Sequence, residues 1–131
     1  MKKEKLVTLA LAAGMALASG MALASGSALA AGDAAKGKKV FSKCKACHSI
    51  TAGKHKVGPS LAGVVGRKAG TAAGFKRYKG LKGSDITWDE TLLDKWLTNP
   101  KKFLGKKTSM GFKLKKADQR ADVIAYLKTL K

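Results

Sequence analysis

The sequence is short of cysteine, of histidine and above all of acidic side chains. Its 131 residues hold two cysteines, two histidines and 8 Asp+Glu against 27 Lys+Arg. Two cysteines are too few for a small secreted fold that disulfides hold together. The shortage of acid leaves a formal net charge of +19, which predicts a polyanionic partner: a nucleic acid, a membrane or an acidic protein surface. Hydrophobic residues make up 45% of the chain, enough for the core of one domain, so the charge does not indicate disorder.

A long segment without any charge follows the basic N-terminus. Three lysines within the first five residues precede an uncharged, alanine-rich stretch from 6 to 31. This is the order of a secretory signal peptide, and Ala28-Leu29-Ala30 matches its small-x-small cleavage pattern. We therefore predict a signal peptide at 1–30, a mature domain at 31–131 and export to the periplasm.

Two other interpretations of this segment stay open. The triplets at 16–18 and 22–24 fit the same cleavage pattern, because a Gly-Met-Ala-Leu-Ala-Ser hexapeptide occurs twice. The uncharged run is also long enough for a retained membrane anchor, although its glycines and serines dilute its hydrophobicity. Cleavage after Ala30 would remove three lysines and one glutamate, leaving a net charge of +17 on 101 residues. It would also leave Met110 as the one methionine.

Two segments near the ends of the mature chain have the spacing of amphipathic helices. Between 33 and 44, Gly37, Val40, Phe41 and Cys44 recur at i, i+3, i+4 and i+7, and Asp33 is placed as the N-cap. From 117 to 130, apolar residues again form one face, with acidic residues near the start and lysines near the end. The sequence therefore predicts a helix at each end of the domain.

The middle of the chain is predicted as a long loop followed by a third helix. Thr87 and Glu90 form a capping box for a helix that runs to Asn99, where the following proline stops it. The glycine-rich stretch from 49 to 86 predicts a loop with one short helix near 59–65. So long a loop is unusual in a compact domain. We therefore expect it to wrap a group that is not protein.

Cys44, Cys47 and His48 form the C-x-x-C-H pattern of c-type haem attachment. Two thiols about one helical turn apart can each form a thioether to a vinyl group on the same edge of the porphyrin. The adjacent imidazole can then bind the iron. This spacing predicts one haem c, covalently bound through the two cysteines and ligated by His48.

Three other roles for these residues are weaker. A thioredoxin-like redox pair needs a strand before it, and the sequence has no β-rich segment there. A structural zinc site needs four ligands, and only His55 remains, at a spacing that does not match the usual pairs. A disulfide between Cys44 and Cys47 would leave His48 without a role.

Met110 is the candidate for the sixth iron ligand. It lies in a polar, lysine-rich loop, where a core methionine is not expected, while His55 is the rival ligand. The lysines beside His55 make it more typical of a loop histidine with a structural hydrogen bond. Ligation by His48 and Met110 would fill both axial positions, which favours electron transfer over oxygen or peroxide chemistry.

In the order of its motifs, the chain resembles the class I c-type cytochromes, and is similar to the bacterial cytochrome c2 and mitochondrial cytochrome c group. The resemblance covers residues 32–131. Besides the Cys44–His48 motif, it rests on Val57–Leu61, Gly66–Gly70, Gly74-Phe75, Thr87-Trp88, Asn99–Phe103, Thr108–Phe112 and Val123–Leu127.

The resemblance implies an all-α fold, in which three main helices and long loops surround one covalently bound haem. It implies that the Pro59 carbonyl accepts a hydrogen bond from His48, and that Arg67 and Trp88 hold a haem propionate. It also implies that Gly37 meets Tyr126 where the terminal helices cross, and that Phe112 and Leu127 line the haem pocket. Two departures leave finer details open: Trp96 stands where many relatives have tyrosine, and Tyr78 comes one residue late.

The resemblance further implies a monomeric, periplasmic one-electron carrier without a nucleic-acid partner. It would shuttle electrons from a cytochrome bc complex to a photosynthetic reaction centre or a terminal cytochrome oxidase, docking transiently at the membrane surface. Lysines near the attachment and ligand segments would steer it to acidic surfaces of these complexes. The alternative is a peroxidase-like haem enzyme with a displaceable methionine. The candidate steering residues are Lys43, Lys45, Lys54, Lys101, Lys102, Lys106 and Lys107.

Overall fold

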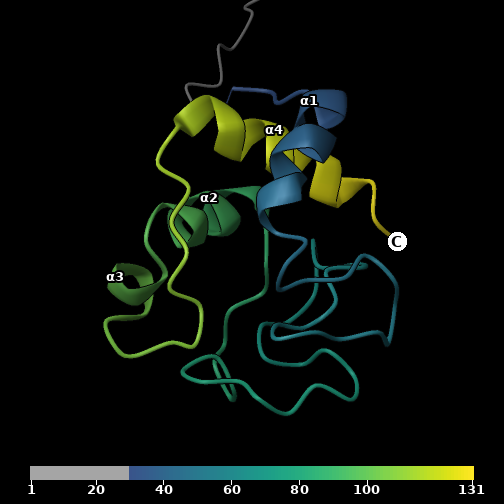
Figure 1. Cartoon of the computed structure of the whole chain (residues 1–131). Coiled ribbons are helices and arrows are strands. Elements are labelled where there is room, and N and C mark those ends of the chain that lie inside the picture. Colours follow the sequence, from purple (N-terminus) through teal and green to yellow (C-terminus); the bar gives the residue numbers. More distant parts are fainter. Residues whose placement is uncertain (1–29) are drawn as a thin grey trace, which may run out of the picture.

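The computed structural model describes residues 30–131. The predicted signal peptide, with its alternative cleavage sites, lies outside these residues except for Ala30. The described chain forms helices α1 (Ala34–Val40), η1 (Phe41–Lys43), α2 (Glu90–Thr98), α3 (Pro100–Leu104) and α4 (Ala117–Lys128) (Figure 1). Its only β pairing is an isolated bridge between Lys68 and Thr87, so the all-α prediction is confirmed. Within this part of the chain, no helix is long and apolar enough to span a membrane.

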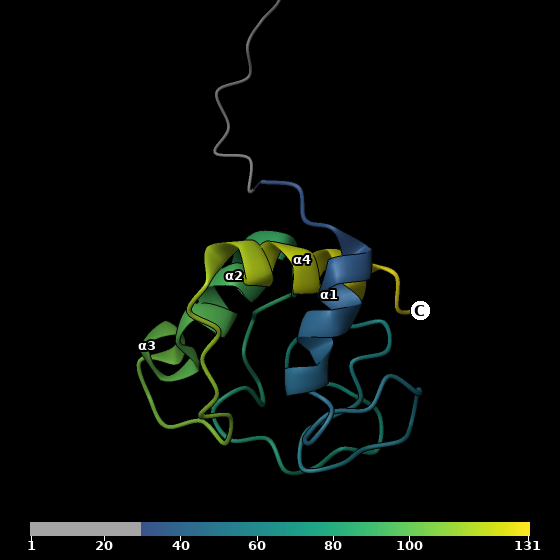
Figure 2. The ribbon, with the colours of Figure 1, turned by 45° about the horizontal axis from the view of Figure 1, so that its top comes forward.

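The first and last helices cross in close contact on one side of the molecule (Figures 1 and 2). Gly37 is buried at the crossing, where an added Cβ would lie 1.9 Å from the Asp122 carbonyl oxygen and 2.8 Å from the Tyr126 Cβ. Asp33 caps α1 by accepting a hydrogen bond from the Lys36 amide (3.0 Å). Its own amide donates to the Asp122 carboxylate (2.8 Å). The predicted cap and the meeting of Gly37 with Tyr126 are thus both present.

The start of α2 differs from its prediction. Asp89 is the N-cap, and its carboxylate accepts a hydrogen bond from the Leu92 amide (2.7 Å). The predicted capping box of Thr87 and Glu90 is wrong, because Thr87 is extended and pairs with Lys68. A nearer carboxylate therefore takes the capping role.

The proline after α2 both ends one helix and begins another. Asn99 is extended, and its side chain accepts a hydrogen bond from the Lys102 amide (3.1 Å), which starts α3. Helix α3 has no counterpart among the predicted helices, because Asn99-Pro100 indicates the end of one helix, while proline is also favoured in the first turn of the next. The break also frees the Leu97 carbonyl, which accepts a hydrogen bond from the Leu114 amide (2.7 Å).

The loops from 44 to 89 run on the opposite side from the crossing of α1 and α4 (Figure 1). The short helix predicted at 59–65 is wrong: this stretch forms turns, and Gly63 and Gly66 adopt positive φ angles of 65° and 89°. The two terminal helices are also shorter than predicted, since the first ends in a 3-10 turn and the last stops at Lys128. The core between helices and loops contains Phe41, Val64, Ala69, Trp88, Leu93, Trp96, Leu97, Leu114, Val123, Ile124 and Leu127.

Candidate functional site

One cavity lies between the helices and the long loops, and all seven residues predicted for the site line it. They come from four separate parts of the chain: the segment after η1, the long loop, the stretch at the start of α2, and the loop before α4. The tertiary structure therefore brings together residues that are up to 66 positions apart. The seven are Cys44, Cys47, His48, Pro59, Arg67, Trp88 and Met110.

The imidazole of His48 is held in one orientation. Its Nδ1 lies 2.7 Å from the carbonyl oxygen of Pro59, and because a carbonyl can only accept, Nδ1 carries the proton and donates. Nε2 is then left with its lone pair. Gly58 packs so closely that an added Cβ would lie 2.4 Å from His48 Cε1. Burial lowers the pKa of His48, although the hydrogen bond to Pro59 opposes the shift, so the ring is neutral at neutral pH.

The two thiols lie on one turn of the chain. The amides of Cys47 and His48 both bond to the Cys44 carbonyl, at 3.1 and 2.9 Å. Both cysteines are free, so no disulfide joins them. Burial raises the pKa of Cys44 to about 11, with a smaller contribution from Cys47, which keeps this thiol protonated. Among residues 30–131, His, Cys, Asp and Glu side chains form no group of three that could hold a metal ion, so the zinc alternative gains no support.

The cavity wall is positively charged. Lys43, Arg67 and Lys79 line it, and no acidic residue of the described chain does. The Arg67 guanidinium donates to the carbonyls of Ala62 and Ser60, both at 3.0 Å. Burial lowers the pKa of Arg67, and Tyr78 partly offsets the shift. Such a wall suits a ligand that carries carboxylates.

Lys79 and Tyr78 belong to this wall, although the sequence does not predict a role for Lys79 and leaves that of Tyr78 open. The Tyr78 hydroxyl accepts a hydrogen bond from the Ala72 amide (2.9 Å) while lining the cavity. No sequence pattern marks Lys79, because it is one of many lysines and only the path of the loop brings it to the cavity.

Two buried tryptophans form the aromatic part of the wall. Trp88 and Trp96 are each 6% exposed, their ring centroids lie 5.4 Å apart, and Phe103 packs against both. Both rings line the cavity. Sequence periodicity identified Trp96 only as part of a buried stripe.

The loop before α4 provides Met110, which is half-buried and lines the cavity. Phe112 also lines the cavity, as predicted, and is 38% exposed. Leu127 is buried in the core and is not among the residues that line the cavity, so its contact with a haem stays a prediction. Leu127 comes from α4 and belongs to the same core cluster as Phe41 of η1 and Trp96 of α2.

His55 has the structural role that the sequence indicated. Its Nδ1 accepts a hydrogen bond from the Ser60 amide (3.0 Å), and its Nε2 donates to the Ala73 carbonyl (2.8 Å). Both ring nitrogens are therefore occupied by backbone groups, and the ring does not line the cavity. This leaves Met110 as the candidate for the second axial ligand.

The residues around the cavity fit a haem. They offer two free thiols on one turn, a neutral imidazole with Nε2 free, a thioether, two indole rings and three cations. Thioether bonds, axial ligation by nitrogen and sulfur, and binding of two carboxylates are what a c-type haem requires.

Comparison with known proteins points in the same direction. The family model described as Cytochrome c matches residues 34–131. Cytochrome c2 iso-2 of Magnetospirillum molischianum is 53% identical over 91 residues, which are 70% of this chain and 94% of that protein. Cytochrome c of Chlamydomonas reinhardtii is 48% identical over 96 residues, covering 72% of this chain and 86% of that one.

Solved structures agree in fold. Ferricytochrome c2 from Rhodopseudomonas palustris is 45% identical with a TM-score of 0.68, covering 76% of this chain and 99% of its own. Cytochrome c2 from Rhodobacter sphaeroides is 37% identical with a TM-score of 0.71, covering 76% and 96%.

Proposed function

Because this chain belongs to the cytochrome c family and is a class I electron carrier with covalently bound haem c, we propose that it is a periplasmic one-electron shuttle with His48 and Met110 as axial ligands. The observation that carries the proposal is the meeting of four separate chain segments around one cavity. The haem supplies the Fe(II)/Fe(III) couple.

The attachment segment would hold the group on one side. Cys44 and Cys47 supply the two thiols for the thioether bonds, and His48 supplies a neutral Nε2. The hydrogen bond from Nδ1 to Pro59 supports this role twice, because it keeps the proton off Nε2 and makes the ring a stronger donor.

Met110 would close the opposite side. A thioether is a soft, uncharged ligand, and together with a histidine it raises the reduction potential and leaves no open position for oxygen or peroxide. Arg67 and Trp88 would neutralise and bind a propionate, whose burial would otherwise be costly. A peroxidase-like activity is not favoured, because His55, the one other histidine, already bonds through both ring nitrogens and lies outside the cavity.

The surface lysines would direct the carrier to its partners. Lys101, Lys102, Lys106 and Lys107 are exposed and flank the Met110 loop. Positive charge around the exposed edge of the site would steer the protein to acidic surfaces of a cytochrome bc complex and of a reaction centre or oxidase. Such complexes form quickly and dissociate quickly, as a shuttle requires.

The visible absorption spectrum of the purified holoprotein tests the ligand assignment. We expect a c-type α-band in the reduced state and the weak iron–sulfur charge-transfer band in the oxidised state. Met110→Ala should abolish the charge-transfer band and lower the reduction potential, while Lys113→Ala, at an exposed position of the same loop that does not line the cavity, should retain the band. A charge-transfer band that survives in Met110→Ala would show that another residue is the ligand.

A further inference from the structure

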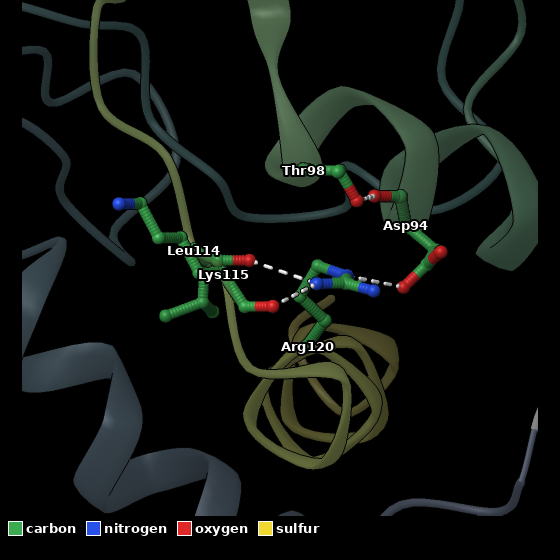
Figure 3. Close-up of polar contacts among 5 residues, drawn as sticks. All are labelled: Asp94, Thr98, Leu114, Lys115 and Arg120. Atoms are coloured by element: carbon green, nitrogen blue, oxygen red, sulfur yellow. Dashed lines mark hydrogen bonds and ion pairs between the residues drawn. The ribbon is translucent and has the colours of Figure 1, made fainter.

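Arg120 on α4 makes three hydrogen bonds, one to α2 and two to the loop before α4. Its Nε donates to the Asp94 carboxylate on α2 (2.6 Å). Its Nη1 donates to the backbone carbonyls of Leu114 (3.0 Å) and Lys115 (2.8 Å). Figure 3 shows the guanidinium between α2 and the loop segment that leads into α4. The Arg120 side chain is only 12% exposed, and that of Asp94 is 22% exposed.

Leu114 is therefore held from both sides. Its carbonyl accepts from Arg120, and its amide donates to the Leu97 carbonyl that the break before Pro100 leaves free (2.7 Å). Its side chain is 4% exposed in the core. We call this set of contacts, made by Arg120 with Asp94, Leu114 and Lys115, the Arg120 clamp.

Leu114, the clamp residue nearest to Met110 in the sequence, comes four residues after it. Between 106 and 113, the described structure contains a single hydrogen bond in which the loop takes part, from the Met110 amide to the Thr108 hydroxyl (3.3 Å). The loop that carries the thioether has few ties of its own. Its C-terminal end is fixed by the clamp and by the bond to Leu97.

We propose that Arg120 is a positioning residue for Met110, and that the clamp determines how strongly this side chain holds the sixth ligand position. The inference rests on the proposed function. A ligand on an anchored loop loses little conformational freedom when it binds, whereas a released loop gains freedom whenever the thioether leaves. Loss of the clamp should therefore shift the balance towards the state without Met110 bound.

A second ion pair provides the control. Glu90 on α2 and Lys128 on α4 join the same two helices as Asp94 and Arg120 do, but both are exposed and neither bonds to the ligand loop. Asp94→Asn and Glu90→Gln each remove one carboxylate from α2. Only Asp94→Asn changes a residue of the Arg120 clamp, because Glu90 pairs with Lys128 instead.

The experiment measures binding of imidazole to the oxidised holoprotein at pH 7, followed by the charge-transfer band. Imidazole competes with Met110, so its apparent affinity reports the strength of the thioether bond. We expect Arg120→Lys, which keeps the charge but loses the planar fork, to bind imidazole about tenfold more tightly than wild type. Asp94→Asn should shift the affinity in the same direction by a smaller factor, and Glu90→Gln by less than about twofold.

The possible outcomes separate this inference from the proposed function. A wild-type protein without the charge-transfer band would overturn the assignment of Met110 itself. If the band is present but Arg120→Lys binds imidazole as wild type does, the positioning role is wrong. Equal shifts in Asp94→Asn and Glu90→Gln would also overturn it, because both pairs would then act only by joining α2 to α4. If Arg120→Lys yields no folded holoprotein, the comparison of Asp94→Asn with Glu90→Gln decides.

Discussion

At the scale of single residues, the surroundings of His48 leave its ring one usable nitrogen. The Pro59 carbonyl binds the Nδ1 proton, burial keeps the ring neutral, and Gly58 allows the backbone to lie against the ring face. A C-x-x-C-H motif specifies a histidine next to two thiols. Its orientation comes from Pro59, eleven residues further along the chain.

Gly58→Ala should therefore disturb His48. The new Cβ would lie 2.4 Å from Cε1, and the ring cannot move away without losing its 2.7 Å bond to Pro59. We expect a loss of about 1–3 kcal/mol in the free energy of unfolding, measured by urea denaturation of the holoprotein. Lys113→Ala, at an exposed position outside the cavity, is the control and should stay within about 0.5 kcal/mol of wild type. Equal effects of the two substitutions would contradict this account.

At the scale of elements, two close approaches shape the molecule. Gly37 lets α1 and α4 cross with their backbones nearly in contact. The Asn99-Pro100 break separates α2 from α3 and leaves the Leu97 carbonyl to hold Leu114. The first approach depends on the missing side chain at Gly37. The second depends on the extended backbone of Asn99, which ends α2 before a following amide can bond to the Leu97 carbonyl.

Gly37→Ala tests the first of these approaches. An added Cβ would lie 1.9 Å from a backbone oxygen of α4, so the helices would have to separate. We expect a loss of about 3 kcal/mol or more in the free energy of unfolding, followed by circular dichroism in urea. Lys38→Ala, at the next and exposed position of the same helix, should change it by less than about 0.5 kcal/mol. A Gly37→Ala protein as stable as Lys38→Ala would disprove the close crossing.

At the scale of the whole molecule, the charge is unevenly distributed around the site. No acidic residue of the described chain lines the cavity, while three cations do. Four of the acidic side chains instead take part in capping or ion-pair contacts of the helices: Asp33, Asp89, Glu90 and Asp94. The positive charge at the cavity is thus not neutralised by acidic side chains of the wall.

Charge reversal tests whether this field steers docking. Lys106→Glu with Lys107→Glu, beside the Met110 loop, should slow electron transfer to a membrane oxidase about tenfold at low salt. The slowing should fade as salt screens the field. Lys36→Glu with Lys38→Glu on α1 changes the net charge equally, but should slow transfer much less. Equal slowing by both pairs would mean that only net charge matters.

The predictions that succeeded rest on local spacing. The C-x-x-C-H motif, the cap at Asp33 and the apolar faces of the first and last helices involve residues a few positions apart, whose geometry the chain itself imposes. Two of the failures came where two local signals compete. Thr87 and Asp89 could both cap α2, and Pro100 could both stop a helix and start one, so neighbouring residues alone did not decide between them.

The sequence by itself determined the kind of cofactor and which side chains could hold it, because thioether attachment and axial ligation demand particular residue types. Only the tertiary structure decided how these side chains are held. Arg120 reaches Asp94 across 26 positions, and Trp96 and Lys79 reach the cavity through the path of the backbone. Such contacts have no signature in sequence, since they depend on which distant segments pack together to bury the core.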